Sequence, residues 1–196
     1  MVEAMRIGRI LSPVHSLGPG ERLCIWTQGC SKKCMGCISP ELQELSESDI
    51  DEEILWKLMQ QIADKNNCSG LTVSGGDPME QPDSLLLLLE KARSRFKDIL
   101  VYTGFSIEDI LKGCASEAGI KCLDYIDVLI DGRYVKELNT SDCVLRGSSN
   151  QKITYLNEKM KPIYEEYMKQ GRIVETFTHN QETIITGILN EVTDYE

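Results

Sequence analysis

The segment "LTVSGGDP", Leu71–Pro78, predicts the class of the fold. It opens with a short apolar run typical of a buried strand and ends at a double glycine. Pro82 and Asp83 then open "SLLLLLEKARSRF", which predicts a helix that is buried around most of its circumference. A strand, a glycine turn and a helix in this order make one βα unit.

The same order recurs on both sides of this segment. "LCIWT" at Leu23–Thr27, "ILVYTGF" and "DVLIDG" predict three further strands. Ser106 and Asp109 resemble a capping box that opens the helix "IEDILKG". Because strands that alternate with helices indicate parallel βα units, we expect an α/β fold.

The length and composition favour one domain. The chain has 196 residues, and 41% of them are hydrophobic, which is enough to build one packed core. We therefore expect a single domain over residues 1–196. "RIVETFTH" and "ETIITGIL" predict a C-terminal hairpin extension at 172–190.

The charge and hydropathy patterns exclude several classes of function. A formal net charge of -10 argues against a protein that grips phosphate backbones, and we expect neither a nucleic-acid nor a membrane partner. Apolar runs stay far below the about 18 to 20 residues that span a bilayer. "MVEAMRIGRILSPV" lacks the apolar region of a secretory signal, so the expected location is the cytoplasm.

Three of the eight cysteines are clustered. They are Cys30, Cys34 and Cys37 in the stretch "IWTQGCSKKCMGCISPEL". We expect the other five to be small buried apolar side chains, namely Cys24, Cys68, Cys114, Cys122 and Cys143.

The number of clustered cysteines limits the kind of site. Structural zinc takes four ligands, although catalytic zinc keeps three, so zinc remains an alternative. A thioredoxin-like redox pair leaves one thiol surplus. A cubane iron–sulfur cluster held by three thiolates fits the number better, because its fourth iron is then open to a small molecule. Lys32 and Lys33 either offset negative charge on such a cluster or are solvated loop lysines.

The unusual residues follow the ends of the predicted strands. The cysteine cluster follows the first of the four, "SGGDP" the second, "YTGF" the third and "DGRY" the fourth. In parallel α/β folds the loops at the C-terminal ends of the strands share one rim. We expect these four loops to meet there.

These residues resemble a known superfamily. Cys30, Cys34 and Cys37, with Gly75 and Gly76, are similar to the CxxxCxxC and GGE-type loops of radical S-adenosylmethionine enzymes. "GPGERLCIWTQGCSKKCMGC", "SGGDP", "VYTGF", "DVLIDGRY" and "LRGSSNQKI" resemble, in this order, the activating proteins of anaerobic (class III) ribonucleotide reductase. Those proteins are small activases of a glycyl radical enzyme.

The resemblance implies the cofactors and the reaction. Cys30, Cys34 and Cys37 would hold a [4Fe–4S] cluster, and S-adenosyl-L-methionine would be cleaved reductively to a 5'-deoxyadenosyl radical. That radical would abstract a hydrogen atom from a glycine of the reductase, which is the implied partner, with a flavodoxin or ferredoxin as electron donor. No catalytic side chain is implied, because the radical chemistry belongs to the cofactor.

The resemblance also implies a set of cofactor-binding residues. Around S-adenosylmethionine it places Gly36, Ile38, Gly75, Gly76, Asp77, Asp131, Gly132 and Arg133. Asp77 replaces the more usual Glu and has a shorter reach. Trp26 either shields the cluster or is plain core.

The segment "RGSSNQ" has two readings. Arg146, Ser148 and Asn150 either contact the cofactor or form a structural turn.

The chain length predicts the shape of the fold. A full (βα)8 barrel takes about 250 residues, so this chain has room for about five or six parallel βα units. We expect an incomplete, side-open (βα) barrel whose open side admits a macromolecular substrate. Two alternatives stand beside the activase: a radical enzyme that modifies another peptide or small molecule, and a non-catalytic iron–sulfur or zinc protein.

Overall fold

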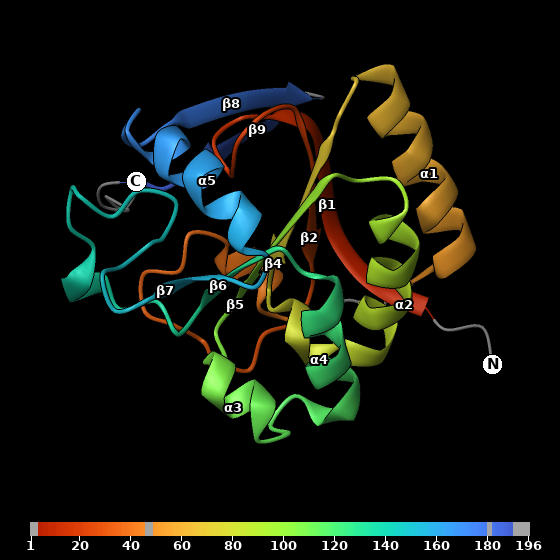
Figure 1. Cartoon of the computed structure of the whole chain (residues 1–196), viewed down its shortest axis with the longest axis horizontal. Helices are drawn as coiled ribbons and strands as arrows, with labels where there is room; N and C mark the ends of the chain where they lie inside the picture. The colour runs from red at the N-terminus through yellow and green to blue at the C-terminus, as the bar shows by residue number, and fades with distance from the viewer. Residues whose placement is uncertain (1–3, 46–48, 180–181, 190–196) are drawn as a thin grey trace.

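The computed structural model describes residues 4–45, 49–179 and 182–189, and it contains one seven-stranded sheet (Figure 1). The strand order is β3-β1-β2-β4-β5-β6-β7. The bounds are β1 Ala4–Val14, β2 Arg22–Thr27, β3 Asp49–Asp51, β4 Gly70–Gly75, β5 Asp98–Thr103, β6 Val128–Asp131 and β7 Lys152–Tyr155.

The centre of the sheet is parallel and its margins are antiparallel. β2, β4, β5 and β6 pair side by side in parallel, whereas β1 pairs antiparallel with β2 and β3, and β7 pairs antiparallel with β6. The α/β class is confirmed. The expectation of five or six parallel units is wrong for the described residues, in which four neighbouring strands are parallel, because β1 and β7 enter the sheet in the opposite direction.

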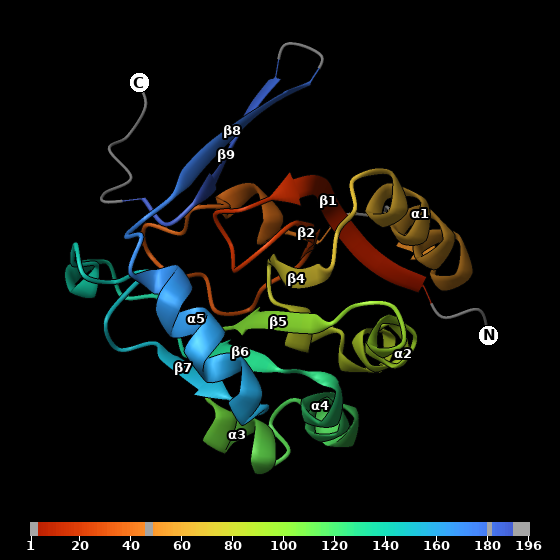
Figure 2. The ribbon, with the colours of Figure 1, turned by 45° about the horizontal axis from the view of Figure 1, so that its top comes forward.

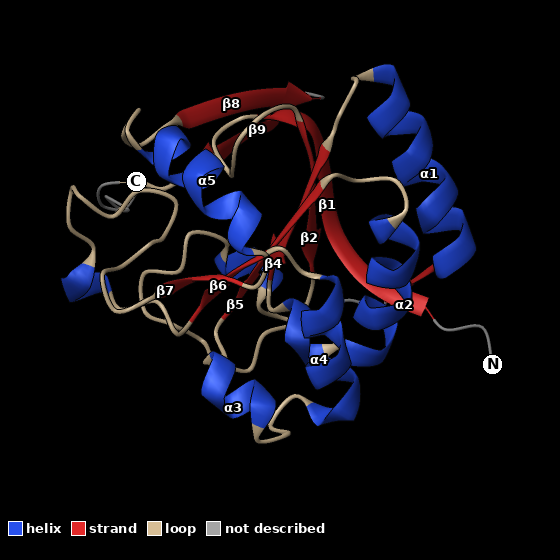
Figure 3. Cartoon of the chain, in the orientation of Figure 1, coloured by secondary structure: helices blue, strands red, loops and turns tan. Residues whose placement is uncertain are grey.

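Four helices cover one face of the sheet (Figure 3). They are α1 Glu52–Lys65, α2 Pro82–Arg93, α3 Ile107–Leu111 and α4 Ser116–Cys122. Leu55, Met59 and Ala63 of α1 recur at helical spacing and are buried against the strands. Short 3-10 turns occur at Pro40–Leu42, Pro78–Glu80, Leu123–Tyr125, Lys136–Leu138 and Glu158–Met160.

The opposite face is covered by other elements. Helix α5, Lys161–Met168, packs Tyr164 and Tyr167 against alternate residues of the same strands, such as Leu100 and Ile130. β8 Val174–His179 and β9 Glu182–Gly187 pair antiparallel in the segment where a hairpin is expected, and they project beside β1 and β2 (Figure 2).

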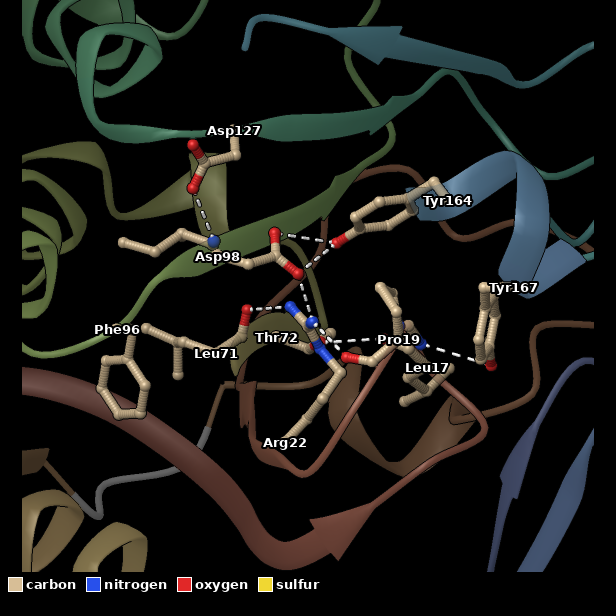
Figure 4. A network of polar contacts seen from close by, with 12 residues as sticks. Leu17, Pro19, Arg22, Leu71, Thr72, Phe96, Asp98, Asp127, Tyr164 and Tyr167 are labelled. Atoms are coloured by element: carbon tan, nitrogen blue, oxygen red, sulfur yellow. Dashed lines mark hydrogen bonds and ion pairs between the residues drawn. The ribbon is translucent and has the colours of Figure 1, made fainter. Parts of the chain in front are cut away.

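A buried polar network lies at the N-terminal end of the parallel strands (Figure 4). Arg22, which is fully buried, pairs with Asp98 and donates 2.6 Å hydrogen bonds to Oγ1 of Thr72 and the carbonyl oxygen of Leu71. The Tyr164 hydroxyl donates to Asp98 at 2.8 Å and thereby attaches α5.

The described helices include none that is long and apolar enough to cross a membrane.

Candidate iron–sulfur and cofactor site

The loops that follow β2, β4, β5 and β6 line one cavity at the C-terminal ends of these strands, as their order predicts. The cavity opens on the face of the sheet opposite to α1 and α2, because residues of that face, such as Trp26 and Tyr102, form its floor. All three clustered cysteines contribute to its wall. The structure therefore brings the chemically unusual loops together.

The cysteine loop is closed at its base by backbone hydrogen bonds. The N–H of Gly29 donates to the carbonyl oxygen of Leu42 at 2.9 Å, and the N–H of Cys30 donates to that of Gln43 at 3.0 Å. Gly36 turns the chain between Cys34 and Cys37 with a φ of +73°, a region that favours glycine. The loop therefore has a defined path.

Cys30, Cys34 and Cys37 are free and partly buried. Burial raises the pKa of the Cys30 thiol above its usual value, and the nearby backbone N–H groups of Lys32 and Lys33 offset only part of this rise. The irons of iron–sulfur clusters prefer thiolate ligands, so three thiols on the wall of one cavity are a suitable set of ligands for such a cluster.

The three thiols are a donor set that suits a cubane cluster. Within the described ranges, no three His, Cys, Asp or Glu side chains are arranged to hold a single metal ion. Structural zinc takes four ligands, whereas a cubane cluster can take each of three thiolates on a different iron. The chemistry and number of the clustered cysteines therefore fit a multi-iron cluster. All eight cysteines are free, so the three thiols are not paired in a disulfide.

The double glycine allows β4 to pass very close to the cysteine loop. A Cβ on Gly75, whose φ is +118°, would lie 2.2 Å from the backbone nitrogen of Thr27. A Cβ on Gly76 would lie 2.4 Å from the carbonyl oxygen of Gly29. The glycines are thus required by the packing of two loops, and both also line the cavity.

Asp77 lines the cavity but has its carboxylate engaged within the chain. Oδ1 accepts from the Thr103 hydroxyl at 2.8 Å and from the Met79 N–H at 3.0 Å, and Oδ2 accepts from the Gly104 N–H at 2.9 Å. Burial raises its pKa to about 6. The side chain joins the loops after β4 and β5.

The other expected cofactor residues divide into two groups. Gly36, Ile38 and Gly132 line the cavity. Asp131 does not: it is buried, and it accepts hydrogen bonds from the Ile107 N–H and the Thr154 hydroxyl, both at 3.0 Å. The Arg133 guanidinium also lies outside the lining and donates to the carbonyl oxygen of Lys32.

The segment "RGSSNQ" forms a structural turn. Arg146 donates to the carbonyl oxygen of Gln151 at 2.9 Å, Ser148 accepts from the Val135 N–H at 3.1 Å, and Asn150 donates to the carbonyl oxygen of Arg133 at 2.7 Å. These three candidates lie outside the cavity lining. Gln151, which sequence reasoning did not single out, lines the cavity and donates to the carbonyl oxygen of Gly132 at 2.9 Å.

The remaining candidate residues differ in their burial. Trp26 is buried, packs in the core and also lines the cavity. The Lys32 side chain is 15% exposed and lines the cavity, whereas that of Lys33 is 65% exposed. Of the dispersed cysteines, Cys114 is exposed, so the expectation of burial is wrong there and correct for the other four.

Several lining residues were missed by sequence reasoning. Tyr102, Tyr134 and Asn139 reach the cavity, as do residues 185–189 of the C-terminal segment. The chain's own C-terminal segment thus covers part of the rim that we expected to be open. Its sequence, "ITGIL", carries no polar signature that would have marked it as part of a site.

The comparisons with known proteins agree with this geometry. Residues 16–154 match the family model of a 4Fe-4S single cluster domain. The fold and the site thus define a protein with one iron–sulfur cluster carried by an α/β domain.

The relatives identify the family more closely. The chain is 34% identical over 140 residues to the anaerobic ribonucleoside-triphosphate reductase-activating protein of Enterobacteria phage T4, covering 69% of this chain and 85% of the relative. It is 32% identical over 145 residues to the protein of the same name from Salmonella typhimurium and 31% identical over 150 residues to that from Escherichia coli K12, each match covering 71% of this chain and 91% of the relative. The chain belongs to the family of anaerobic ribonucleoside-triphosphate reductase-activating proteins.

Proposed function

We propose that the chain is a radical S-adenosylmethionine activase that installs a glycyl radical on anaerobic ribonucleotide reductase. One observation carries the proposal: the free thiols of Cys30, Cys34 and Cys37 line the same cavity as the double-glycine loop, in a chain of this family. When bound, a [4Fe–4S] cluster and S-adenosylmethionine supply the electron transfer and the 5'-deoxyadenosyl radical.

The chain's own residues would bind and orient the cofactors and shield them from water. The three cysteines would ligate three irons, and Gly36, Ile38, Gly75, Gly76 and Gly132 would shape the wall for S-adenosylmethionine. Asp77 holds the loops after β4 and β5 at a fixed separation. Trp26 and Tyr102 make an apolar floor that excludes water, which suits a reactive radical.

We assign Asp131 and Arg133 a supporting role. Both oxygens of Asp131 are already occupied, and the Arg133 guanidinium holds the cysteine loop instead of facing the cavity. Neither residue is part of the cavity lining.

The sheet is proposed to be an incomplete, side-open (βα) barrel. In a doubly wound sheet the crossover helices cover both faces. Here α1, α2, α3 and α4 pack on one face, and the cavity lies on the other. Crossover helices on one side only are the arrangement of a barrel wall, and α5 on the other side follows the antiparallel strand β7 and connects no two parallel strands.

The partner and setting follow from the same proposal. The reductase would bring its glycine to the cavity, and a flavodoxin or ferredoxin would supply the electron. The eight free thiols agree with the reducing conditions of a cytoplasm.

Anaerobic reconstitution with iron and sulfide tests the activity. The reduced protein should convert S-adenosylmethionine to 5'-deoxyadenosine, Cys37→Ala should abolish this, and Cys114→Ala, which removes an exposed thiol outside the loop, should not. An intact, reduced cluster that gives no 5'-deoxyadenosine would refute the radical assignment. A glycyl radical signal in electron paramagnetic resonance on added reductase then tests the substrate.

A second candidate function has one observation in its favour. Residues 185–189 cover part of the cavity rim, and a partly covered site also suits another peptide or a small molecule. Cleavage of S-adenosylmethionine without a glycyl radical on the reductase would favour this alternative.

A further inference from the structure

The stretch between Cys30 and Cys34 is held by the loops that follow other strands. Oε1 of Glu80, which lies after β4, accepts from the Ser31 N–H at 3.2 Å and also from the Ser31 hydroxyl. The guanidinium of Arg133, which lies after β6, donates to the carbonyl oxygen of Lys32. The backbone that follows Cys30 is therefore held by charged side chains at two points, the Ser31 N–H and the Lys32 carbonyl, and charge-assisted hydrogen bonds are the stronger kind.

These held groups are close to Cys30 along the chain. Ser31 follows Cys30 directly and Lys32 is the next residue, so the Ser31 N–H and the Lys32 carbonyl lie on the backbone that carries the Cys30 side chain. Lys33, with a φ of +44°, then turns the backbone before Cys34. A change in the position of this backbone would therefore be transmitted to the sulfur.

The side chain of Lys32 completes the attachment. Its ammonium lies 3.2 Å from Oε1 of Glu80 and 3.3 Å from the centroid of the Phe105 ring. Its stem passes so close to Gly104 that a Cβ there would lie 2.9 Å from Cγ of Lys32. Among the described residues, the ammonium of its neighbour Lys33 has a single ion-pair contact, at 3.5 Å with Glu44, whose side chain is 80% exposed. Adjacent lysines of one loop thus differ in their attachment, which provides a matched control.

We propose that Glu80 and Arg133 are positioning residues for the cluster ligand Cys30, acting through the Ser31 and Lys32 peptides. The proposal rests on the proposed iron–sulfur site. Holding the loop in place before the cluster arrives reduces the ordering entropy that binding must overcome. Mutation of groups that hold metal ligands in place without touching the metal typically weakens metal binding by about 10- to 100-fold.

The experiment compares Glu80→Ala and Arg133→Ala with Lys33→Ala. In the reduced, cluster-free chain, hydrogen exchange followed by mass spectrometry reports the protection of residues 29–37. In Glu80→Ala and Arg133→Ala, which we call the clamp variants, this segment should exchange at least about tenfold faster than in the wild type. In Lys33→Ala it should exchange at the wild-type rate. In the reconstituted chain, iron release to a chelator should accelerate by about tenfold or more in the same two variants.

Each outcome decides the proposal. Wild-type values for either hydrogen exchange or iron release in both clamp variants would overturn it. Exchange of the buried strand β5 serves as the gauge of folding. If β5 also loses protection, the variant Arg133→Lys replaces Arg133→Ala in the test, because lysine keeps the charge but lacks the forked guanidinium. Faster exchange confined to residues 29–37, together with faster iron release, would support the proposal. Wild-type values in Arg133→Lys would overturn it.

The test is independent of the activity. If the wild-type protein fails to cleave S-adenosylmethionine, the proposed function is refuted, yet the exchange result on the cluster-free chain still shows whether Glu80 and Arg133 hold the loop.

Discussion

The hydroxyl of Thr103 donates a 2.8 Å hydrogen bond to Oδ1 of Asp77 and so joins the C-terminal ends of β5 and β4. The Gly104 N–H donates to the second oxygen of the same carboxylate at 2.9 Å. The acidic residue after the double glycine is therefore part of the frame of the cavity. An Asp suits this position because its short side chain is long enough to reach the Thr103 hydroxyl and the Gly104 N–H of the adjacent loop.

Asp77→Asn should destabilise the protein. The amide would keep one acceptor oxygen but would direct an N–H group at the Gly104 N–H, which leaves a buried donor unsatisfied. The expected loss in the free energy of unfolding at pH 7 is about 1 to 3 kcal/mol. Urea denaturation of the cluster-free chain measures it. An unchanged value would mean that the carboxylate does not brace the loops.

The same variant tests a pH dependence. Burial raises the pKa of Asp77 from 3.8 to about 6, so between these values the folded chain retains a proton that the unfolded chain has released. The contribution of Asp77 to stability is complete below pH 3.8 and falls as pH rises through about 6, by up to about 1.4 kcal/mol per pH unit. The stability of the wild type minus that of Asp77→Asn should therefore decrease over this window. A constant difference would contradict the assignment.

Gly75→Ala should be more damaging than an alanine at another left-handed glycine. Its Cβ would lie 2.2 Å from the Thr27 nitrogen, in a backbone region that disfavours side chains, so we expect a loss of about 2 to 5 kcal/mol. Gly113 has a φ of +85°, but a Cβ there would meet nothing within 4 Å, so Gly113→Ala should cost only about 1 to 2 kcal/mol. Equal losses in urea denaturation would show that close packing at Gly75 is not limiting.

The parallel core could be predicted from the sequence because local signals coincide there. β2, β4, β5 and β6 each combine an apolar run with a loop of unusual composition, and Ser106 caps α3 through the Asp109 N–H as its spacing predicts. The meeting of the four loops then follows from the rule that parallel strands end at one rim.

Other elements depend on contacts that a local pattern does not encode. β1 carries Arg6, Gly8 and Arg9, which disturb the alternation expected of a strand, yet it pairs along its length with β2 and β3. Ile50 fits the helical spacing of the following segment but lies in β3, and α1 begins after the N-cap Asp51. In these places tertiary pairing overrides the local preference.

The site likewise contains some residues that the sequence alone reveals and others that only the fold brings there. Cys30, Cys34 and Cys37 carry their chemistry in their residue type, so their spacing is sufficient to propose a cluster. Glu80 and the C-terminal residues 185–189 reach the site through folding alone. Arg133 resembles a ligand-binding residue in sequence, but the structure places its guanidinium on the Lys32 carbonyl.

Arg22→Met should be among the more destabilising single changes in the chain. It would leave the Asp98 carboxylate without its buried cation, and breaking one side of a buried pair costs about 3 to 5 kcal/mol. Tyr164→Phe removes one hydrogen bond to the same carboxylate and should cost about 1.5 to 3 kcal/mol. Lys121→Met, which breaks an exposed 3.0 Å pair with Glu117, should leave the free energy of unfolding nearly unchanged, because solvent screens that pair. The opposite ranking would refute a buried ion pair at Arg22.

His15 should make the attachment of the C-terminal hairpin depend on pH. Its Nδ1 lies 2.9 Å from Glu175 on β8, and its Nε2 lies 2.9 Å from Glu21. The hydrogen bonds to Glu175 and then to Glu21 raise the pKa of His15 above 6.5. For a base whose folded pKa is raised, the stabilisation is complete below pH 6.5 and is lost as pH rises through the folded value.

His15→Gln isolates this contribution, because it removes the charge while the backbone N–H of residue 15 can still donate to Oε2 of Glu175, a bond of 2.8 Å in the wild type. The wild type should be more stable than the variant at pH 6, by less than about 1 kcal/mol because the His15 and Glu21 side chains are half exposed. That advantage should shrink between pH 6 and 9 in urea denaturation. Since residues 185–189 line the cavity, hydrogen exchange of β9, corrected for the intrinsic effect of pH, should rise over the same window in the wild type and stay flat in the variant. A stability difference that is constant or grows with pH would show that a protonated His15 does not secure the hairpin.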